Sequence, residues 1–170
     1  MPVKITIDAN LINARGKLPA MNALEKWQAE GKLQLVGAQR LEDEIASHPL
    51  QPEANAKVAR MENISEPAVW GISKWGKATW ASAGKVSYKE LASILFPAVD
   101  LEKLSDNQKN DVMHLLGHAY SDSEIFITDN TKDFIANGRQ ETLLSGFKIL
   151  VMTASNAITF LSERHGWKPS

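Results

Sequence analysis

The stretch Ile125-Phe-Ile-Thr-Asp-Asn-Thr-Lys-Asp-Phe134 decides the fold class. Its apolar run ends at a hydroxyl, and two carboxylates and an amide follow within the next five residues. A second run of this kind, Val3-Lys-Ile-Thr-Ile-Asp8-Ala-Asn10, opens the chain and also ends in an acid. Proteins of the α/β class bind ligands in the crevice beyond the carboxyl ends of their strands. Both stretches therefore indicate strands that lead into a site.

The composition is typical of an ordinary globular protein. The chain has 170 residues, which is within the range of one domain, with 44% apolar and 23% charged residues. Its formal net charge of −1 provides no global basic field, so contact with a nucleic acid would need a local patch. Cysteine is absent, which excludes disulfides and fits a reducing cytosol. The N-terminus shows no signal-peptide pattern and no apolar stretch is long enough to cross a membrane, so we expect a cytoplasmic protein.

Strands and helices alternate along the first fifty residues. We expect a strand over residues 4–7 and a helix that begins at Pro19 and ends near Gly31. A second strand over residues 33–36 and a second helix over residues 39–47 follow. This order predicts parallel strand pairing and right-handed crossovers.

The same alternation returns in the last third of the chain. Ser105-Asp-Asn-Gln108 has the form of a capping box that opens a helix. A strand over residues 124–128, a helical stretch near 140–144, a strand over 148–152 and a final helix from residue 153 or 155 follow. The pattern predicts a single α/β domain over residues 1–170, with an insertion at about residues 50–104.

The insertion has a helical pattern at its two ends and an irregular centre. Residues 54–61 and 88–95 are expected to be helical, and Pro97 ends the second of these helices. Between them, Trp70, Trp75 and Trp80 recur every five residues among lysines. These side chains could form a platform for single-stranded nucleic acid, where stacking contributes ~1–3 kcal/mol per base. The alternative, which the usual burial of large aromatics favours, is that they form the core of an added helical lobe.

Each acidic residue near the strand ends has a structural explanation when it is taken alone. Asp8 could cap a helix, because Asp is a good N-cap residue. Asp111, in the first turn of its helix, is favoured by the helix dipole whatever its function. Asp129, Asn130 and Asp133 could simply form the turn after their strand, and Asp133 could cap the segment that follows.

Two helices carry the remaining candidates. Glu42 and Glu44 lie on opposite flanks of the apolar stripe of the second helix, so only one of them can face a given site, while Asp43 points to solvent. On the helix after Ser105, Asp111, His114 and His118 could be taken as a metal-binding face. We expect instead that these three residues form a partly exposed polar edge.

Taken together, the acidic residues are harder to explain by structural roles alone. Acids at the ends of two strands and on two neighbouring helices would converge at one edge of a parallel sheet. Four carboxylates in one place cannot all stay ionised without a cation. Ligand sets made only of oxygen suit Mg²⁺ or Mn²⁺, and Mg²⁺ is usually bound together with substrate phosphates.

Three segments in this order resemble the motifs of the PIN-domain nucleases, a family that includes the bacterial VapC-like toxins and is related to flap endonucleases. Ile7-Asp8-Ala9-Asn10-Leu11-Ile12 is similar to the opening Asp-x-Asn-x-Leu-Ile of that family. Leu41-Glu-Asp-Glu44-Ile45 is similar to its apolar-x-x-Glu-Leu step, which selects Glu44 over Glu42. Asp111 opens a helix, and the stretch from Thr128 to Phe134 then matches Thr-x-(Asp/Asn)-x-x-Asp-Phe. The likeness covers residues 1–47 and 106–155.

The resemblance implies a PIN-like three-layer α/β/α fold with a short central parallel sheet and helices on both faces. It implies an endoribonuclease that uses Mg²⁺ or Mn²⁺ to hydrolyse phosphodiester bonds in RNA. Carried over residue by residue, the acidic catalytic and metal-binding set is Asp8, Glu44, Asp111 and Asp133. Asp129 is a further candidate metal ligand, and the motif leaves open whether Asp129 or Asp133 completes the site. Asn10, Thr128 and Asn130 would be orienting residues.

The resemblance also bears on partners and on rival functions. It implies RNA as the bound molecule, single-stranded at the site, and for toxin members an antitoxin-type protein partner and a homodimer. Small toxin members lack room for a segment such as residues 64–104, so the motifs alone do not assign the toxin role. The alternatives are a non-catalytic PIN-like module that binds nucleic acid or protein, and a phosphotransfer enzyme. The latter commonly needs a second Asp two residues after the first, where this chain has Asn10.

Overall fold

A parallel sheet organises the part of the chain that the computed structural model describes, namely residues 1–8, 11–12, 18–38, 61–65, 67–69, 72 and 86–169. In these ranges the sheet has five strands in the order β3-β2-β1-β4-β5, and every neighbouring pair is parallel. The strands are β1 (Val3–Ile7), β2 (Leu33–Ala38), β3 (Glu62–Ile64), β4 (Ile125–Ile127) and β5 (Val151–Met152). The predicted α/β class with parallel pairing is therefore confirmed.

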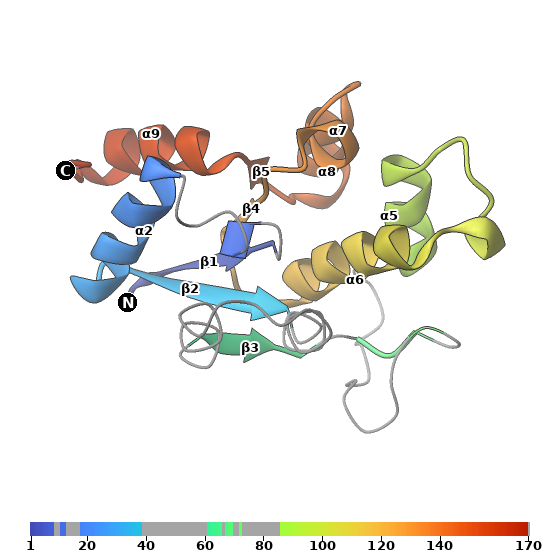
Figure 1. The fold of residues 1–170 in the computed structure, drawn as a ribbon, viewed down its shortest axis with the longest axis horizontal. Helices are drawn as coiled ribbons and strands as arrows, with labels where there is room; N and C mark the ends of the chain where they lie inside the picture. Colours follow the sequence, from blue (N-terminus) through green and yellow to red (C-terminus); the bar gives the residue numbers. More distant parts are fainter. Residues whose placement is uncertain are drawn as a thin grey trace.

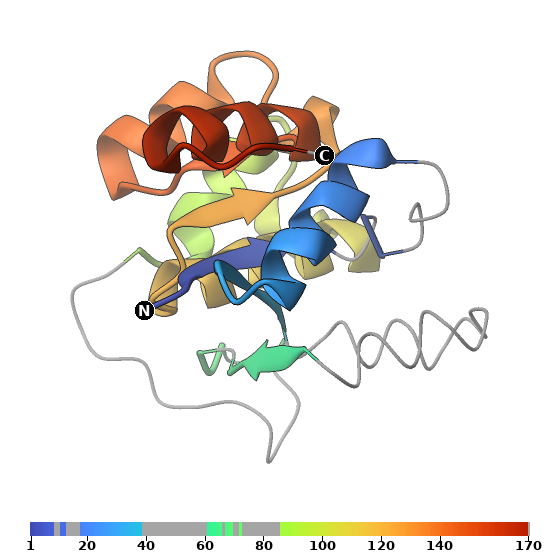
Figure 2. The same cartoon turned by 90° about the vertical axis from the view of Figure 1, so that its left-hand side faces the viewer.

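Helices cover both faces of this sheet (Figure 1). The side chains of strand β4 contribute to both faces, because successive side chains of a strand point to opposite sides of the sheet. Ile125 and Ile127 pack into one core with helices α2 (Pro19–Ala29) and α9 (Ala154–His165). Phe126 packs into a second core with α5 (Tyr88–Leu95), α6 (Asp106–Tyr120) and α8 (Arg139–Phe147). Figure 2 shows α2 and α9 side by side on their face of the sheet. The described part of the chain also contains the short helix α7 (Thr131–Phe134) and a 3₁₀ turn, η2 (Leu101–Lys103).

The local signals that were predicted to start and stop these helices are present in the structure. Pro19 is the first residue of α2, and Gly31 follows the helix with a left-handed φ of 71°. Ser105 and Gln108 form the expected capping box of α6. Ser87 and Glu90 form a second box at the start of α5, which the sequence prediction did not include. Helix boundaries in this chain are therefore set by short-range hydrogen bonding.

Strand β5 is shorter than predicted. The expected strand over residues 148–152 is reduced to Val151–Met152, and α8 extends beyond the expected 140–144. The reason is that Lys148 adopts a left-handed φ of 60° and caps α8, with its backbone N–H directed to the carbonyls of Leu143 and Leu144. Ile149 also donates to the Leu143 carbonyl at 3.1 Å. These residues complete the helix end and are not available to the sheet.

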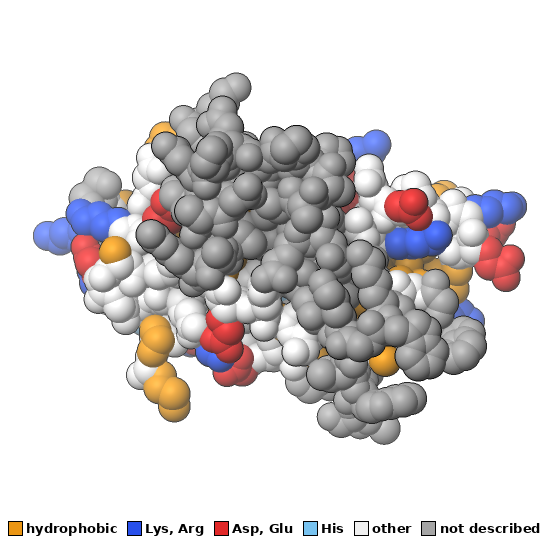
Figure 3. All heavy atoms as spheres, turned by 60° about the horizontal axis from the view of Figure 1, so that its bottom comes forward, with side chains coloured by type: hydrophobic (Ala, Val, Ile, Leu, Met, Phe, Trp, Pro, Cys, Tyr) orange, Lys and Arg blue, Asp and Glu red, His pale blue; other side chains and the backbone are white. Residues whose placement is uncertain are grey.

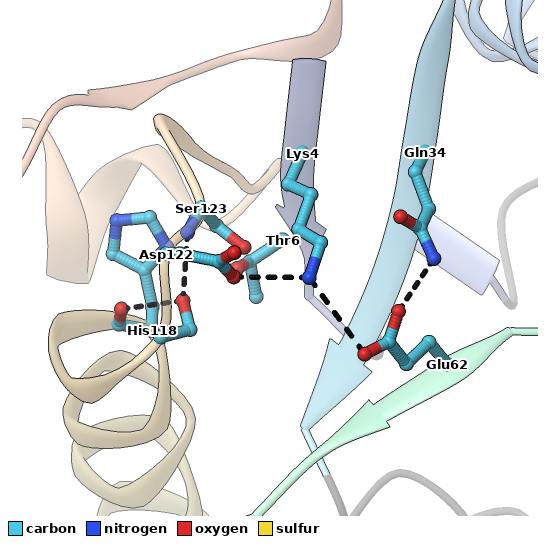
Figure 4. A network of polar contacts seen from close by, with 8 residues as sticks. Lys4, Thr6, Gln34, Glu62, His118, Asp122 and Ser123 are labelled. Atoms are coloured by element: carbon cyan, nitrogen blue, oxygen red, sulfur yellow. Dashed lines mark hydrogen bonds and ion pairs between the residues drawn. The ribbon is translucent and has the colours of Figure 1, made fainter. Parts of the chain in front are cut away.

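At the surface, one lysine of β1 contacts a residue of β3 and a residue of the turn between α6 and β4. Lys4 Nζ lies 3.1 Å from Asp122 Oδ1 and 3.7 Å from Glu62 Oε1 (Figure 4). Gln34 of β2 also donates to the Glu62 carboxylate. The hydrogen bond to Asp122 raises the pKa of Lys4 above its usual value. This contact set joins β1, β2 and β3 to the turn after α6.

Several predicted features lie outside the described residues: the helix over 39–47, the helical stretch over 54–60, the three tryptophans Trp70, Trp75 and Trp80, and the neighbouring lysines Lys74, Lys77 and Lys85. Among the helices that are described, none combines the length and the apolar character that crossing a lipid bilayer requires.

Candidate functional site

Asp8 lies at the carboxyl end of the central strand β1, and its side chain is only 1% exposed. Its backbone N–H donates to the Ile127 carbonyl at 2.9 Å, so strand pairing places it beside the end of β4. Its Oδ2 accepts a hydrogen bond from the Thr128 hydroxyl at 2.7 Å, and its Oδ1 lies 3.2 Å from His114 Nδ1. The carboxylate is therefore held by one residue that follows β4 and one residue of α6.

Thr128 links Asp8 to the turn that follows β4. Its hydroxyl donates to Asp8 and accepts the backbone N–H of Asn130 at 3.0 Å. The hydroxyl therefore donates its one hydrogen to Asp8 and accepts through one lone pair from Asn130. The Thr128 side chain is fully buried, which excludes water as a competing partner.

Asn130 caps helix α7 and joins two further carboxylates. Its Oδ1 accepts the backbone N–H of Asp133 at 3.3 Å. Its Nδ2 lies 3.0 Å from Asp133 Oδ2 and 3.4 Å from Asp111 Oδ2. An amide nitrogen has two hydrogens, so it can serve both carboxylates, whereas the flipped amide would turn an oxygen toward them. The hypothesis that Asp133 caps the segment after it is wrong, because Asp133 lies within α7, and the cap of that helix is Asn130.

A continuous set of hydrogen bonds therefore connects three of the predicted acids. It runs from Asp8 through Thr128 and Asn130 to Asp111 and Asp133. Parallel pairing of β1 with β4 brings the two strand ends together, and the packing of α6 adds Asp111. Residues more than a hundred positions apart in the sequence thus meet at the carboxyl ends of two neighbouring strands.

The predicted partly exposed polar edge on α6 is correct for Asp111, which is partly exposed, and wrong for the two histidines. His114 is 2% exposed and His118 is 4% exposed. Thr6 and Asp8 point to the same face of β1 because they are two residues apart, and the two histidines are one helical turn apart. His114 meets Asp8, and His118 Nδ1 lies 2.9 Å from Thr6 Oγ1. The histidines are buried because β1 offers each of them a polar partner.

His118 makes the second of these two contacts, with Thr6. Figure 4 shows its ring beside Thr6, and the ring also packs edge-on against Phe126 with centroids 5.6 Å apart. Burial lowers the pKa of His118 to about 4. The ring is therefore neutral near pH 7, which suits a structural role. The pairing of the two histidines with Thr6 and Asp8 was not predicted. Its signal in the sequence is a pair of polar residues at i and i+2 of a strand together with a pair at i and i+4 of a helix.

The remaining predicted site residues are placed differently. Asp129 follows Thr128 with its side chain exposed, outside the hydrogen-bonded set described above. Of the two residues left open by the motif, Asp133 is thus the one that joins the other acids. Glu44 and Asn10 lie outside the described residues.

The acids provide the right atoms for a hard divalent cation. Asp8, Asp111 and Asp133 offer only carboxylate oxygens, the ligands that Mg²⁺ and Mn²⁺ prefer. Within the described ranges, no three His, Asp or Glu side chains lie close enough together to hold a metal ion as they stand. The amide of Asn130 lies between two of the carboxylates and is within hydrogen-bond distance of both. The donor set fits such an ion in chemistry, with Glu44 as the fourth predicted member.

On the described part of the face in Figure 3, acidic and basic side chains lie interspersed. This distribution agrees with the net charge of −1.

Comparison of the chain with models of known protein families, with curated proteins and with solved structures gives no significant match.

Proposed function

We propose that this chain is a metal-dependent nuclease of the PIN type that hydrolyses phosphodiester bonds in RNA. The observation that supports it is the set of hydrogen bonds joining Asp8, Asp111 and Asp133 through Thr128 and Asn130 at the carboxyl ends of β1 and β4. These are neighbouring strands in the middle of the sheet, the place where α/β proteins gather a site.

Asp8, Asp111 and Asp133 would hold Mg²⁺ or Mn²⁺, together with Glu44. When bound, such an ion polarises the phosphodiester and lowers the pKa of a coordinated water. Asp8 is buried and held at both oxygens, so its part is to bind and orient. Asp111 and Asp133 are partly exposed, so an Oδ atom of either can accept a proton from water. Thr128 and Asn130 hold the three carboxylates in place through hydrogen bonds.

The test is Mn²⁺ titration with thermal melting, followed by cleavage of end-labelled single-stranded RNA and of DNA of the same sequence. An ion that binds only the folded protein raises the melting temperature by mass action. We expect this rise and RNA cleavage in the wild type, and neither in Asp8→Asn. Full activity of a folded Asp8→Asn variant would contradict the assignment.

A matched pair of variants decides which acid of the last motif takes part. Asp133→Asn removes a carboxylate of the hydrogen-bonded set, and Asp129→Asn removes an exposed one four residues earlier. Each change removes one negative charge, and the two residues are only four positions apart. We expect Asp133→Asn to lose the Mn²⁺ effect and Asp129→Asn to keep it.

The second candidate function is a PIN-like module that binds nucleic acid or protein without cleaving it. The observation that favours it is that the described His, Asp and Glu side chains form no group of three at metal-binding distances. Such a module would retain RNA in a binding assay and would leave the labelled RNA intact at every Mn²⁺ concentration.

A further inference from the structure

We propose that His114 is a positioning residue that holds the Asp8 carboxylate in the orientation in which it binds the divalent cation. This inference rests on the proposed function, and it adds a residue that neither the motifs nor the strand ends indicate. Its basis is a contact between two side chains that are nearly inaccessible to solvent: His114 Nδ1 lies 3.2 Å from Asp8 Oδ1, with exposures of 3% and 1%.

The chemistry of the pair determines where the proton lies. An ionised carboxylate only accepts hydrogen bonds, so the contact requires a proton on Nδ1 of His114. Thr128 donates to the other oxygen at 2.7 Å. The carboxylate is therefore held at Oδ1 from α6 and at Oδ2 from the residue after β4.

Two donors on two different oxygens have a geometric consequence. The terminal torsion of an aspartate is broad, so one hydrogen bond leaves the carboxylate plane loosely defined. A second donor on the opposite oxygen fixes that plane and hence the direction of the remaining lone pairs. Removing a partner that orients a metal-binding side chain typically costs about 10- to 100-fold in metal affinity or activity. His114 has the position of such a partner.

His118 provides an internal control on the same helix. It is one turn away, it is also buried, and it contacts a strand residue through its own Nδ1. Its partner is Thr6, however, and not an acid of the site. Loss of His118 should therefore affect folding stability without changing the affinity for the cation.

The experiment compares His114→Asn with His114→Leu. The two replacements have similar volume, but the Asn amide places an N–H donor near the position of Nδ1, whereas Leu has none. We expect His114→Leu to weaken Mn²⁺ binding, measured calorimetrically, by about 10- to 100-fold. It should lower kcat for RNA cleavage with little change in KM, and His114→Asn should recover most of both losses. His118→Asn and His118→Leu should lower the melting temperature and leave the Mn²⁺ affinity unchanged.

Two additional measurements keep the test decisive. If His114→Leu does not fold, His114→Gln replaces it, because its amide reaches the position of Nε2 and not that of Nδ1. Nitrogen-15 NMR of the wild-type imidazoles without metal should show a proton on Nδ1 of His114. A spectrum with no proton on Nδ1 overturns the proposal without any reference to activity.

The outcomes separate this inference from the proposed function. Wild-type protein that binds Mn²⁺ and cleaves RNA, with His114→Leu equal to it, overturns the role of His114 and leaves the nuclease standing. Wild-type protein that neither binds Mn²⁺ nor cleaves RNA overturns both. A loss in His114→Leu that His118→Leu reproduces shows a general packing effect and overturns the positioning role.

Discussion

Thr128 donates its hydroxyl hydrogen to Oδ2 of Asp8 across 2.7 Å, although 120 positions separate the two residues in the sequence. The same hydroxyl accepts the backbone N–H of Asn130, which in turn holds two more carboxylates. One buried hydroxyl is therefore the link between the two halves of the candidate site.

Thr128→Val removes this link while keeping the shape of the side chain. Oδ2 of Asp8 then loses a donor and the N–H of Asn130 loses an acceptor. Leaving buried polar groups without partners costs about 1–3 kcal/mol each, so we expect a clear drop in the free energy of unfolding. Urea denaturation measures this drop. Thr128→Ser retains the hydroxyl and should cost less than Thr128→Val, and equal losses in the two variants would contradict the assigned hydrogen bonds.

Asn130→Asp makes the stability of the protein depend on divalent cations. Asp also caps helices well, so α7 keeps its start. The new carboxylate, however, stands where an amide now donates to Asp111 and Asp133, and three like charges repel one another. We expect a lower melting temperature in a chelator and a larger rise with Mn²⁺ than in the wild type. Asn130→Ser, a neutral cap, is the control, and an equal response to Mn²⁺ in both variants would count against an ion between these acids.

The buried His118 makes folding stability sensitive to acid. Its pKa is about 4 in the folded protein and near 6.5 in the unfolded chain, so the unfolded chain binds the extra proton first as the pH falls. Its contribution is therefore fully present above pH 6.5 and is lost as the pH falls from about 6.5 to about 4. At pH 5 the loss amounts to roughly 2 kcal/mol. Urea denaturation at pH 7.5 and at pH 5 measures the change.

The control for this pH effect is His118→Asn, which cannot titrate in this range. Other groups contribute to the pH dependence of both proteins alike, so the comparison isolates His118. We expect the stability of the variant to fall by roughly 2 kcal/mol less than that of the wild type between the two pH values. Parallel stability curves for the two proteins would show that His118 is not the group responsible.

Ser105→Ala tests the capping box that starts α6. The Ser105 hydroxyl accepts the backbone N–H of Gln108, and the Gln108 side chain accepts the backbone N–H of Ser105. Loss of such a cap costs about 1 kcal/mol. Because α6 carries both Asp111 and His114, fraying at its start should also weaken Mn²⁺ binding. Ser87→Ala removes the equivalent cap of α5 and should lower the free energy of unfolding without changing Mn²⁺ binding.

The limits of several elements could be predicted from the sequence because they depend on neighbouring residues. Pro19 and Gly31 bound α2, and the Ser105 box opens α6, through contacts within a few positions. Strand β5 could not be predicted in full, since Lys148 closes α8 in a left-handed conformation that a lysine rarely adopts.

The residue types of the candidate site, an acid or hydroxyl directly after each of two apolar runs, are determined by the sequence alone. Tertiary structure decided which of them meet. Parallel pairing of β1 with β4 brought Thr128 to Asp8, and the turn after β4 selected Asp133 over Asp129 through the amide of Asn130. It also decided that His114 and His118 are buried. The physical reason is that a polar side chain on a helix becomes a core residue only where the facing strand supplies its hydrogen-bond partner, and that strand is distant in sequence.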